Sequence, residues 1–127
     1  MIHESVLPKI KAGATVRVIE TVKEGAKTRE SRFEGLVLCR KHGSEAGASF
    51  TVRATVAGEG MEKVYPINCQ SISKVEILSS PKKVGRSKIY YVRDISRRQL
   101  RRKTAVAYER TAKMAKGEKV AEAEVSK

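Results

Sequence analysis

Short segments in which apolar and polar side chains alternate dominate the first two thirds of the chain, and they restrict its fold more than any other feature. Residues 15–22 and 50–56 place valines and other apolar side chains at alternate positions. Successive side chains of an extended strand point to opposite sides, so this period of two puts the apolar groups on one face. Both segments therefore predict half-buried β-strands.

Three further segments have the length and composition of strands. Phe33–Cys39 and Ile72–Leu78 are denser apolar runs, whereas Met61–Ile67 is a weaker prediction because Pro66 suits only an edge strand or a strand end. Clusters that contain glycine and favour turns lie between the segments, at residues 23–27, 42–49 and 57–60. This spacing predicts a mainly β fold, a small twisted barrel or sandwich. No strand, helix, strand alternation is visible, which argues against a parallel α/β domain and the enzymes built on one.

The pattern changes at Asp94. Asp94 or Ser96 is suited to cap a helix whose first turns are Arg97–Lys103, and residues 105–125 are rich in Ala, Glu and Lys. We expect a β domain over residues 1–93, with a short N-terminal lead, and a helical C-terminal extension over residues 94–127 that is first basic and then charge-balanced. The end of this extension is either a fraying helix or one that is ordered when it docks on a partner.

Positive charge is concentrated in one stretch. Lys82–Lys103 holds ten Lys or Arg residues against the single acid Asp94, a net +9 of the chain's formal +13. A one-sign block of this kind is typical of a protein that binds a polyanion, whereas a merely soluble surface usually mixes both signs. Tyr90 and Tyr91 lie inside the block and offer ring faces or hydroxyls, as irregular RNA requires.

The predicted nucleic-acid contacts fall into two groups. The main group follows the basic block, where side chains neutralise phosphates and release condensed counterions, and it comprises Lys82, Lys83, Arg86, Lys88, Tyr90, Arg93, Arg97, Arg98, Arg101, Arg102 and Lys103. A second group projects from expected strand ends and loops, where each residue is equally well explained as a solvated charge, and it comprises Lys27, Arg29, Arg40, Lys41 and Arg53. The loop at residues 42–49 is either a plain connection or a finger that reaches a second surface.

Other chemistries lack the residues they need. The sequence has no phosphate-binding glycine loop, no dinucleotide fingerprint and no His-Glu-x-x-His motif, so we expect no enzyme and no cofactor. Cys39 and His42 have a Cys-x-x-His spacing, but the intervening basic residues oppose a cation, and Cys39 is better explained as a core residue. No apolar run approaches the ~20 residues of a membrane helix. We expect no metal, no membrane contact, two free thiols and a cytoplasmic location.

Several blocks resemble one known family, the bacterial large-subunit ribosomal proteins numbered nineteen. The blocks occur in the family's order and at its spacing over about residues 12–104. They are Glu24-Gly25, Lys27, Arg29, Phe33-Glu34-Gly35, Phe50-Thr51-Val52-Arg53, Gly58-x-Gly60-x-Glu62, Tyr65-Pro66 and Arg86-Ser87-Lys88-Ile89-Tyr90-Tyr91-Val92-Arg93. The chain departs from the family in its short lead before the first strand and in its long tail beyond Thr104.

The resemblance implies a structural constituent of the large ribosomal subunit with a small SH3-like β-barrel. It implies binding to large-subunit ribosomal RNA near the subunit interface, contact with small-subunit ribosomal RNA across that interface, and neighbouring large-subunit ribosomal proteins as partners. Two other functions stay open from the residues alone. One is a free-standing RNA- or DNA-binding accessory factor on an SH3-like barrel, and the other is a scaffold protein whose tail helix recruits a partner.

Overall fold

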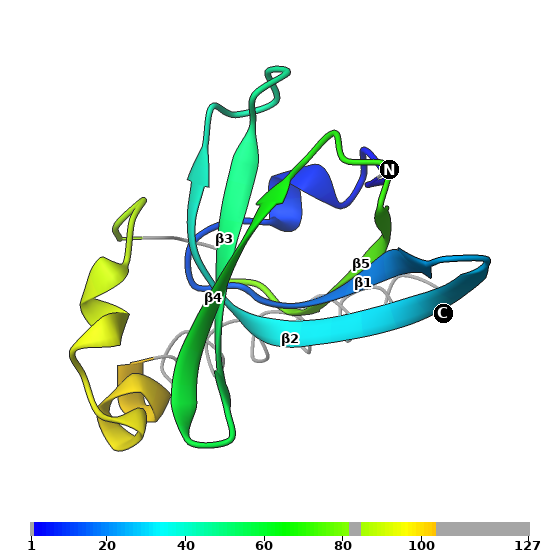
Figure 1. The fold of residues 1–127 in the computed structure, drawn as a ribbon. Helices are drawn as coiled ribbons and strands as arrows, with labels where there is room; N and C mark the ends of the chain where they lie inside the picture. Colours follow the sequence, from blue (N-terminus) through cyan, green and yellow to red (C-terminus); the bar gives the residue numbers. More distant parts are fainter. Residues whose placement is uncertain (1, 82–84, 104–127) are drawn as a thin grey trace, which may run out of the picture.

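A computed structural model describes residues 2–81 and 85–103 (Figure 1). Within them, five antiparallel strands form one sheet in the order β4-β3-β2-β1-β5. The strands are β1 (Thr15–Glu24), β2 (Lys27–Lys41), β3 (Ser49–Val56), β4 (Glu59–Pro66) and β5 (Ile72–Ser79). Two short 3₁₀ helices, η1 (Leu7–Lys9) and η2 (Tyr90–Arg93), precede and follow the sheet, and residues 97–103 are α-helical.

All five predicted strands are confirmed, although β2 is longer than expected. It begins at Lys27 rather than Phe33 because it pairs with β1 along the whole hairpin, from Glu24 opposite Lys27 to Thr15 opposite Leu36. Cross-strand hydrogen bonds thus hold a polar stretch that has no strong strand pattern of its own. Pro66 is the last residue of β4, an edge strand, as its missing N–H requires.

The mainly β fold is confirmed, but the predicted barrel is not, because the sheet is open between its edge strands β4 and β5. The sheet is strongly twisted, and the β3–β4 hairpin runs steeply across the direction of β1 and β2 (Figure 1). Both edge strands contribute side chains to the same buried cluster, Tyr65 from β4 and Ile72 from β5. The SH3-like assignment stays a prediction.

The main core lies on the inner face of this curled sheet. Val16 and Val18 of β1 pack there with Phe50 and Val52 of β3, and all four are fully buried. The N-terminal lead covers part of the same core, because Ile10 is completely buried and Ile2 nearly so. The short lead therefore completes the β domain.

A second apolar cluster lies on the outer face of β2. Leu38 and Ala12 pack there with Ile89 and Val92, which come from the C-terminal segment. The register of β2 against β3 shifts between Val37 and Cys39, so Leu38 is the extra residue of a β-bulge. The Ile89 N–H donates to the Leu38 carbonyl oxygen over 3.0 Å. The bulge therefore supplies both an apolar contact and a backbone acceptor for the C-terminal segment.

The predicted helix after Asp94 is present, and Ser96 is its cap. The Gln99 N–H donates to the Ser96 hydroxyl oxygen over 3.3 Å, and the Leu100 N–H donates to the Ser96 carbonyl over 3.0 Å. The predicted helix over residues 105–125 lies outside the described residues, as do Lys82 and Lys83 of the predicted contact group. The division of the chain at residue 93 stays a prediction.

The close approach of the β2 backbone to the β3 backbone requires a glycine at position 35. A Cβ on this residue would meet the Arg53 carbonyl group, 2.8 Å from its carbon, and would lie 2.9 Å from Val52 Cγ1. Since backbone cannot move aside cheaply, we expect Gly35→Ala to lower the free energy of unfolding by about 1–3 kcal/mol. Urea denaturation measures this, and Gly47→Ala is the control because a Cβ there meets nothing within 4 Å. Equal stability of the two variants would contradict the close approach.

Candidate nucleic-acid interface

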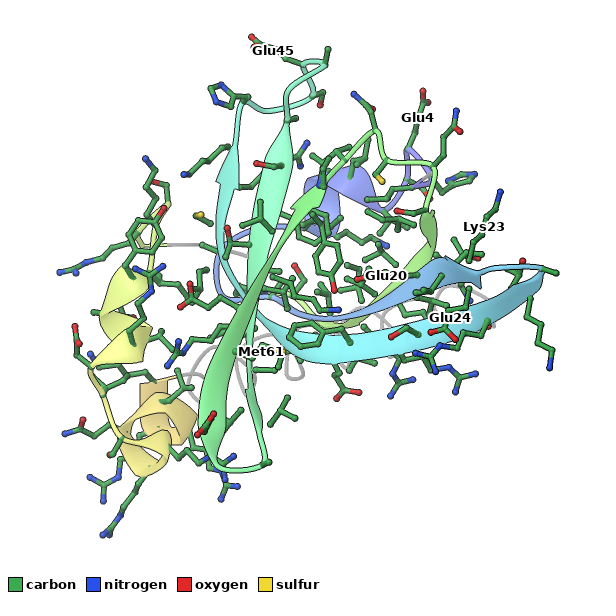
Figure 2. All side chains as sticks on the ribbon, in the orientation of Figure 1. Glu4, Glu20, Lys23, Glu24, Glu45 and Met61 are labelled. Atoms are coloured by element: carbon green, nitrogen blue, oxygen red, sulfur yellow. The ribbon has the colours of Figure 1, made fainter. Side chains whose placement is uncertain are left out.

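The C-terminal segment, residues 85–103, presents a row of exposed cations on one side of the sheet. Ile89, Val92 and Leu100 point toward the second cluster and hold the segment on β2. Between these anchors the basic side chains face solvent. Figure 2 shows side chains that end in nitrogen atoms around this segment, whose ribbon is yellow. The exposed predicted residues are Arg86, Lys88, Arg93, Arg97, Arg98, Arg101, Arg102 and Lys103. The structure thus places the described part of the main group along one exposed segment.

The two tyrosines of the segment contact cations of the same segment. The Arg93 guanidinium lies 4.8 Å from the Tyr90 ring centroid, and the Tyr90 hydroxyl donates to Cys39 Sγ over 3.3 Å. That hydrogen bond, with burial, raises the pKa of Tyr90. The Tyr91 ring has Lys103 at 4.5 Å and Arg86 at 5.4 Å from its centroid. These rings hold the cations in place, so the predicted contact Tyr90 is engaged within the protein.

Glu62 of β4 joins the segment to the sheet through two arginines. Arg93 binds its carboxylate with both Nε and Nη2, at 2.7 and 2.8 Å, and Arg53 Nη1 binds Oε1 at 2.8 Å. Gly60 makes room for this, because a Cβ there would lie 2.8 Å from Arg53 Cζ. We call the three charged side chains, Arg53, Glu62 and Arg93, the Glu62 clamp.

The Glu62 clamp also makes the stability of the folded protein depend on pH. The hydrogen bonds from Arg93 hold the pKa of Glu62 below its ordinary value of 4.5, and Arg53 adds to the effect while burial opposes it. A carboxyl group whose pKa is lowered by folding stabilises the folded protein above its ordinary pKa. That stabilisation is lost as the pH falls through the lowered value. The clamp is therefore fully formed at neutral pH.

The residues of the second group of predicted contacts lie at separate places in the structure. Arg29 pairs with Glu24 across the β1–β2 hairpin, at 2.9 Å between Nη2 and Oε1, although both side chains are largely exposed. Lys27 and Lys41 are exposed at the two ends of β2. Arg53 belongs to the Glu62 clamp, so its charge is shared with Glu62. The group does not form one surface.

Arg40 has a structural role at the base of the β2–β3 loop. Its guanidinium donates to the Leu7 carbonyl and to the Gly43 carbonyl, the latter over 2.8 Å from Nη2. At the other end of the loop, Ala48 is completely buried in the main core. Residues 42–47 of the loop are exposed, and Figure 2 shows Glu45 at the tip, pointing away from the sheet.

A groove of about 500 Å³ lies between the helical residues 97–103 and the outer face of the sheet. Its lining comes from the start of β1, from β2 and β3, and from residues 92–101. Four arginines reach it, Arg53, Arg93, Arg97 and Arg101.

The sequence patterns did not identify this groove or the role of Glu62. The two-residue β3–β4 turn could have indicated the pairing of Glu62 with Arg53, since the turn places them opposite each other.

The structure describes no metal centre in residues 2–81 and 85–103, where no three His, Cys, Asp or Glu side chains come close enough to hold an ion. Cys39 is buried, and its Sγ lies 3.7 Å from the Thr51 hydroxyl. Cys69 is partly exposed, and a hydrogen bond with Ser71 lowers its pKa. Within the same residues, no helix is long and apolar enough to span a bilayer.

Comparison with known proteins identifies the family of the chain. The family model described as Ribosomal protein L19 matches residues 1–105. The chain belongs to the ribosomal protein L19 family. It is 42% identical over 100 residues to the large ribosomal subunit protein bL19 of Fusobacterium nucleatum, covering 79% of this chain and 84% of that protein. It is 44% identical over 87 residues to the bL19 protein of a Ruegeria species, a match that covers 68% of this chain and 70% of that protein. It is 43% identical over 89 residues to bL19c of Porphyra purpurea, a match that covers 70% of this chain and 72% of that protein.

Membership of the L19 family confirms the resemblance found in the sequence. The protein is a structural component of the large ribosomal subunit and not an enzyme. Its location is the cytoplasmic ribosome. The family match ends two residues beyond Lys103, so it includes the whole C-terminal segment described above.

The Glu62 clamp gives a prediction for this L19-family protein. In Glu62→Ala, Arg53 and Arg93 lose their shared carboxylate and repel each other, so the segment should detach more often from β2. A hydrogen bond to a charged group contributes about 1.5–3 kcal/mol, less where solvent reaches it, so we expect roughly fivefold less amide-exchange protection at Ile89. Protection at Val52 in the core should not change. Glu59→Ala, at the exposed end of the β3–β4 hairpin, is the control, and unchanged protection of Ile89 would show that the clamp does not hold the segment.

Proposed function

We propose that this protein binds large-subunit ribosomal RNA through its C-terminal segment. The observation that carries the proposal is the row of exposed cations on a segment whose apolar side chains are anchored on β2. A surface of one sign on a rigid support attracts a polyanion and positions it without ordering a flexible chain first. The RNA phosphates would lie along residues 86–103, with the β domain behind them.

The arginines suit this role for a chemical reason. A guanidinium presents a planar set of donors that matches two phosphate oxygens at once, and it also stacks on unpaired bases. Arg97, Arg98 and Arg102 lie on the exposed helical turns, and no ion pair within the described residues engages them. Arg93 and Arg53, in contrast, share the Glu62 carboxylate, so we assign them to positioning the segment.

We further propose that the protein lies near the subunit interface and contacts small-subunit ribosomal RNA. The exposed tip of the β2–β3 loop supports this second contact, because it projects beyond the ends of β2 and β3, at the opposite end of the molecule from the helical residues 97–103 (Figure 1). Arg40 and the buried Ala48 hold the base of the loop, so the tip is presented on a fixed stem. Neighbouring large-subunit proteins are the other proposed partners.

The main contact is tested by removing three charges. We expect Arg97→Gln, Arg98→Gln and Arg102→Gln together to weaken binding to large-subunit ribosomal RNA by at least about tenfold. They should also make a plot of the logarithm of the binding constant against the logarithm of the salt concentration less steep, by about 2 in slope. Each lost phosphate contact in a single strand contributes about 0.7 to that slope. Filter binding over a salt series measures both. The control is Lys9→Gln, Lys23→Gln and Arg32→Gln, which removes the same charge from exposed positions elsewhere. Equal losses in the two triple variants would contradict a localised site.

The second contact is tested at the loop tip. Ser44→Asp with Ala46→Asp adds two negative charges where we place small-subunit RNA. It should therefore weaken association of the two subunits at low magnesium without changing incorporation into the large subunit. Sedimentation of reassembled subunits measures the association. Ser44→Asn with Ala46→Asn has nearly the same shape without the charge and is the control. If both double variants associate equally well, the tip makes no such contact.

A further inference from the structure

The groove beside residues 97–103 differs in shape from the exposed surface around it. It is a concavity of about 500 Å³, within the volume range of protein sites for small molecules. The backbone of a double helix is convex and its bases are stacked inside, so a duplex can touch only the rim of such a groove. A single nucleotide that has left its stack can enter it.

The walls of the groove carry positive charge on both sides. Arg97 and Arg101 stand one helical turn apart on one wall, and the Glu62 clamp holds Arg53 and Arg93 on the other. Among the described lining residues, Glu34 is the one carboxylate.

Glu34 is already neutralised. Arg17 donates to its Oε2 from Nη2 at 2.9 Å and from Nε at 3.1 Å. An anion in the groove therefore meets an excess of guanidinium groups, two of which, those of Arg53 and Arg93, are already held in place by Glu62.

The floor of the groove is apolar. Leu36 of β2 packs there with Val92 and Leu100, the same side chains that anchor the C-terminal segment. Thr55 of β3 lines the groove from the sheet and is exposed. The site thus combines a surface that favours the flat face of a base with guanidinium groups that favour the attached phosphate.

We propose that this groove binds one unpaired nucleotide of RNA, with the base on the apolar floor and the phosphate at Arg97 and Arg101. The proposal rests on the proposed RNA-binding function and adds to it. Along the rest of the segment the protein contacts only the backbone, whereas here it selects RNA that has a nucleotide free to leave its stack. Phosphate contacts position the protein, and this groove supplies the selectivity for irregular RNA.

The test fills the groove without changing its charge. In the full-length chain, Thr55→Trp places an indole where we put the base, and Thr28→Trp, on an exposed and distant part of β2, is the matched control. Fluorescence anisotropy is measured with a labelled single-stranded RNA hexanucleotide and with a blunt RNA duplex of the same length. We expect Thr55→Trp to weaken binding of the single strand by about tenfold and to leave duplex binding and the thermal midpoint unchanged, and Thr28→Trp to change neither. Equal binding of the single strand by the two variants would overturn the proposal.

A second measurement does not depend on the variant. Methyl resonances of Leu36, Val92 and Leu100 in the wild-type protein should shift on titration with adenosine or uridine monophosphate, and those of Val16 and Val18 in the core should not. If the methyl resonances of none of these three floor residues shift, the proposal of a nucleotide site is wrong. The broader function fails separately, because it requires the Arg97, Arg98 and Arg102 variant to lose affinity for ribosomal RNA whatever occupies the groove.

Discussion

The two-sided burial of β2 is the constraint on which the rest of the structure depends. Val37 faces the main core, Leu38 faces the second cluster, and both are completely inaccessible to solvent. A sheet with one solvated face would need only the first of these contacts. The bulge at Leu38 adds a backbone acceptor on the outer side, so the C-terminal segment is anchored by apolar packing and by a hydrogen bond. The cations of the C-terminal segment are therefore carried on a support that is itself part of the core.

Charge is organised in two ways on this support. On the outer face of the sheet, acids and bases neutralise each other across strands, as Arg17 does between Glu34 and Glu76. On the helical residues, no carboxylate of the described structure forms an ion pair with Arg97, Arg98 or Arg102, which leaves their charge available to a ligand. The Glu62 clamp connects the two regions, since one carboxylate joins Arg53 of the sheet to Arg93 of the segment. The excess charge of the chain is thus concentrated where a polyanion can reach it.

The aromatic residues show how context changes the meaning of a sequence feature. Tyr90 and Tyr91 stand within a basic run, a combination typical of proteins that stack on bases. In the folded chain their rings instead lie against Arg86, Arg93 and Lys103, which orders the cations around them. The apolar surface that an unpaired base would require is found in the groove, on side chains that carry no such signal in the sequence.

Local features of the sequence determined the five strands, the turn between β3 and β4, the Ser96 cap and the position of the basic block. Each of these depends on side-chain periodicity or on residues a few positions apart, and such interactions are present in any extended or helical segment. Only the tertiary structure decided that the sheet stays open, that Leu38 receives Ile89, that Glu62 binds Arg93 and that a groove forms between residues 97–103 and the sheet. These features join residues about thirty to fifty positions apart, and their contacts form only when the twist of the sheet brings the distant segments together. No local pattern in the sequence encodes that meeting.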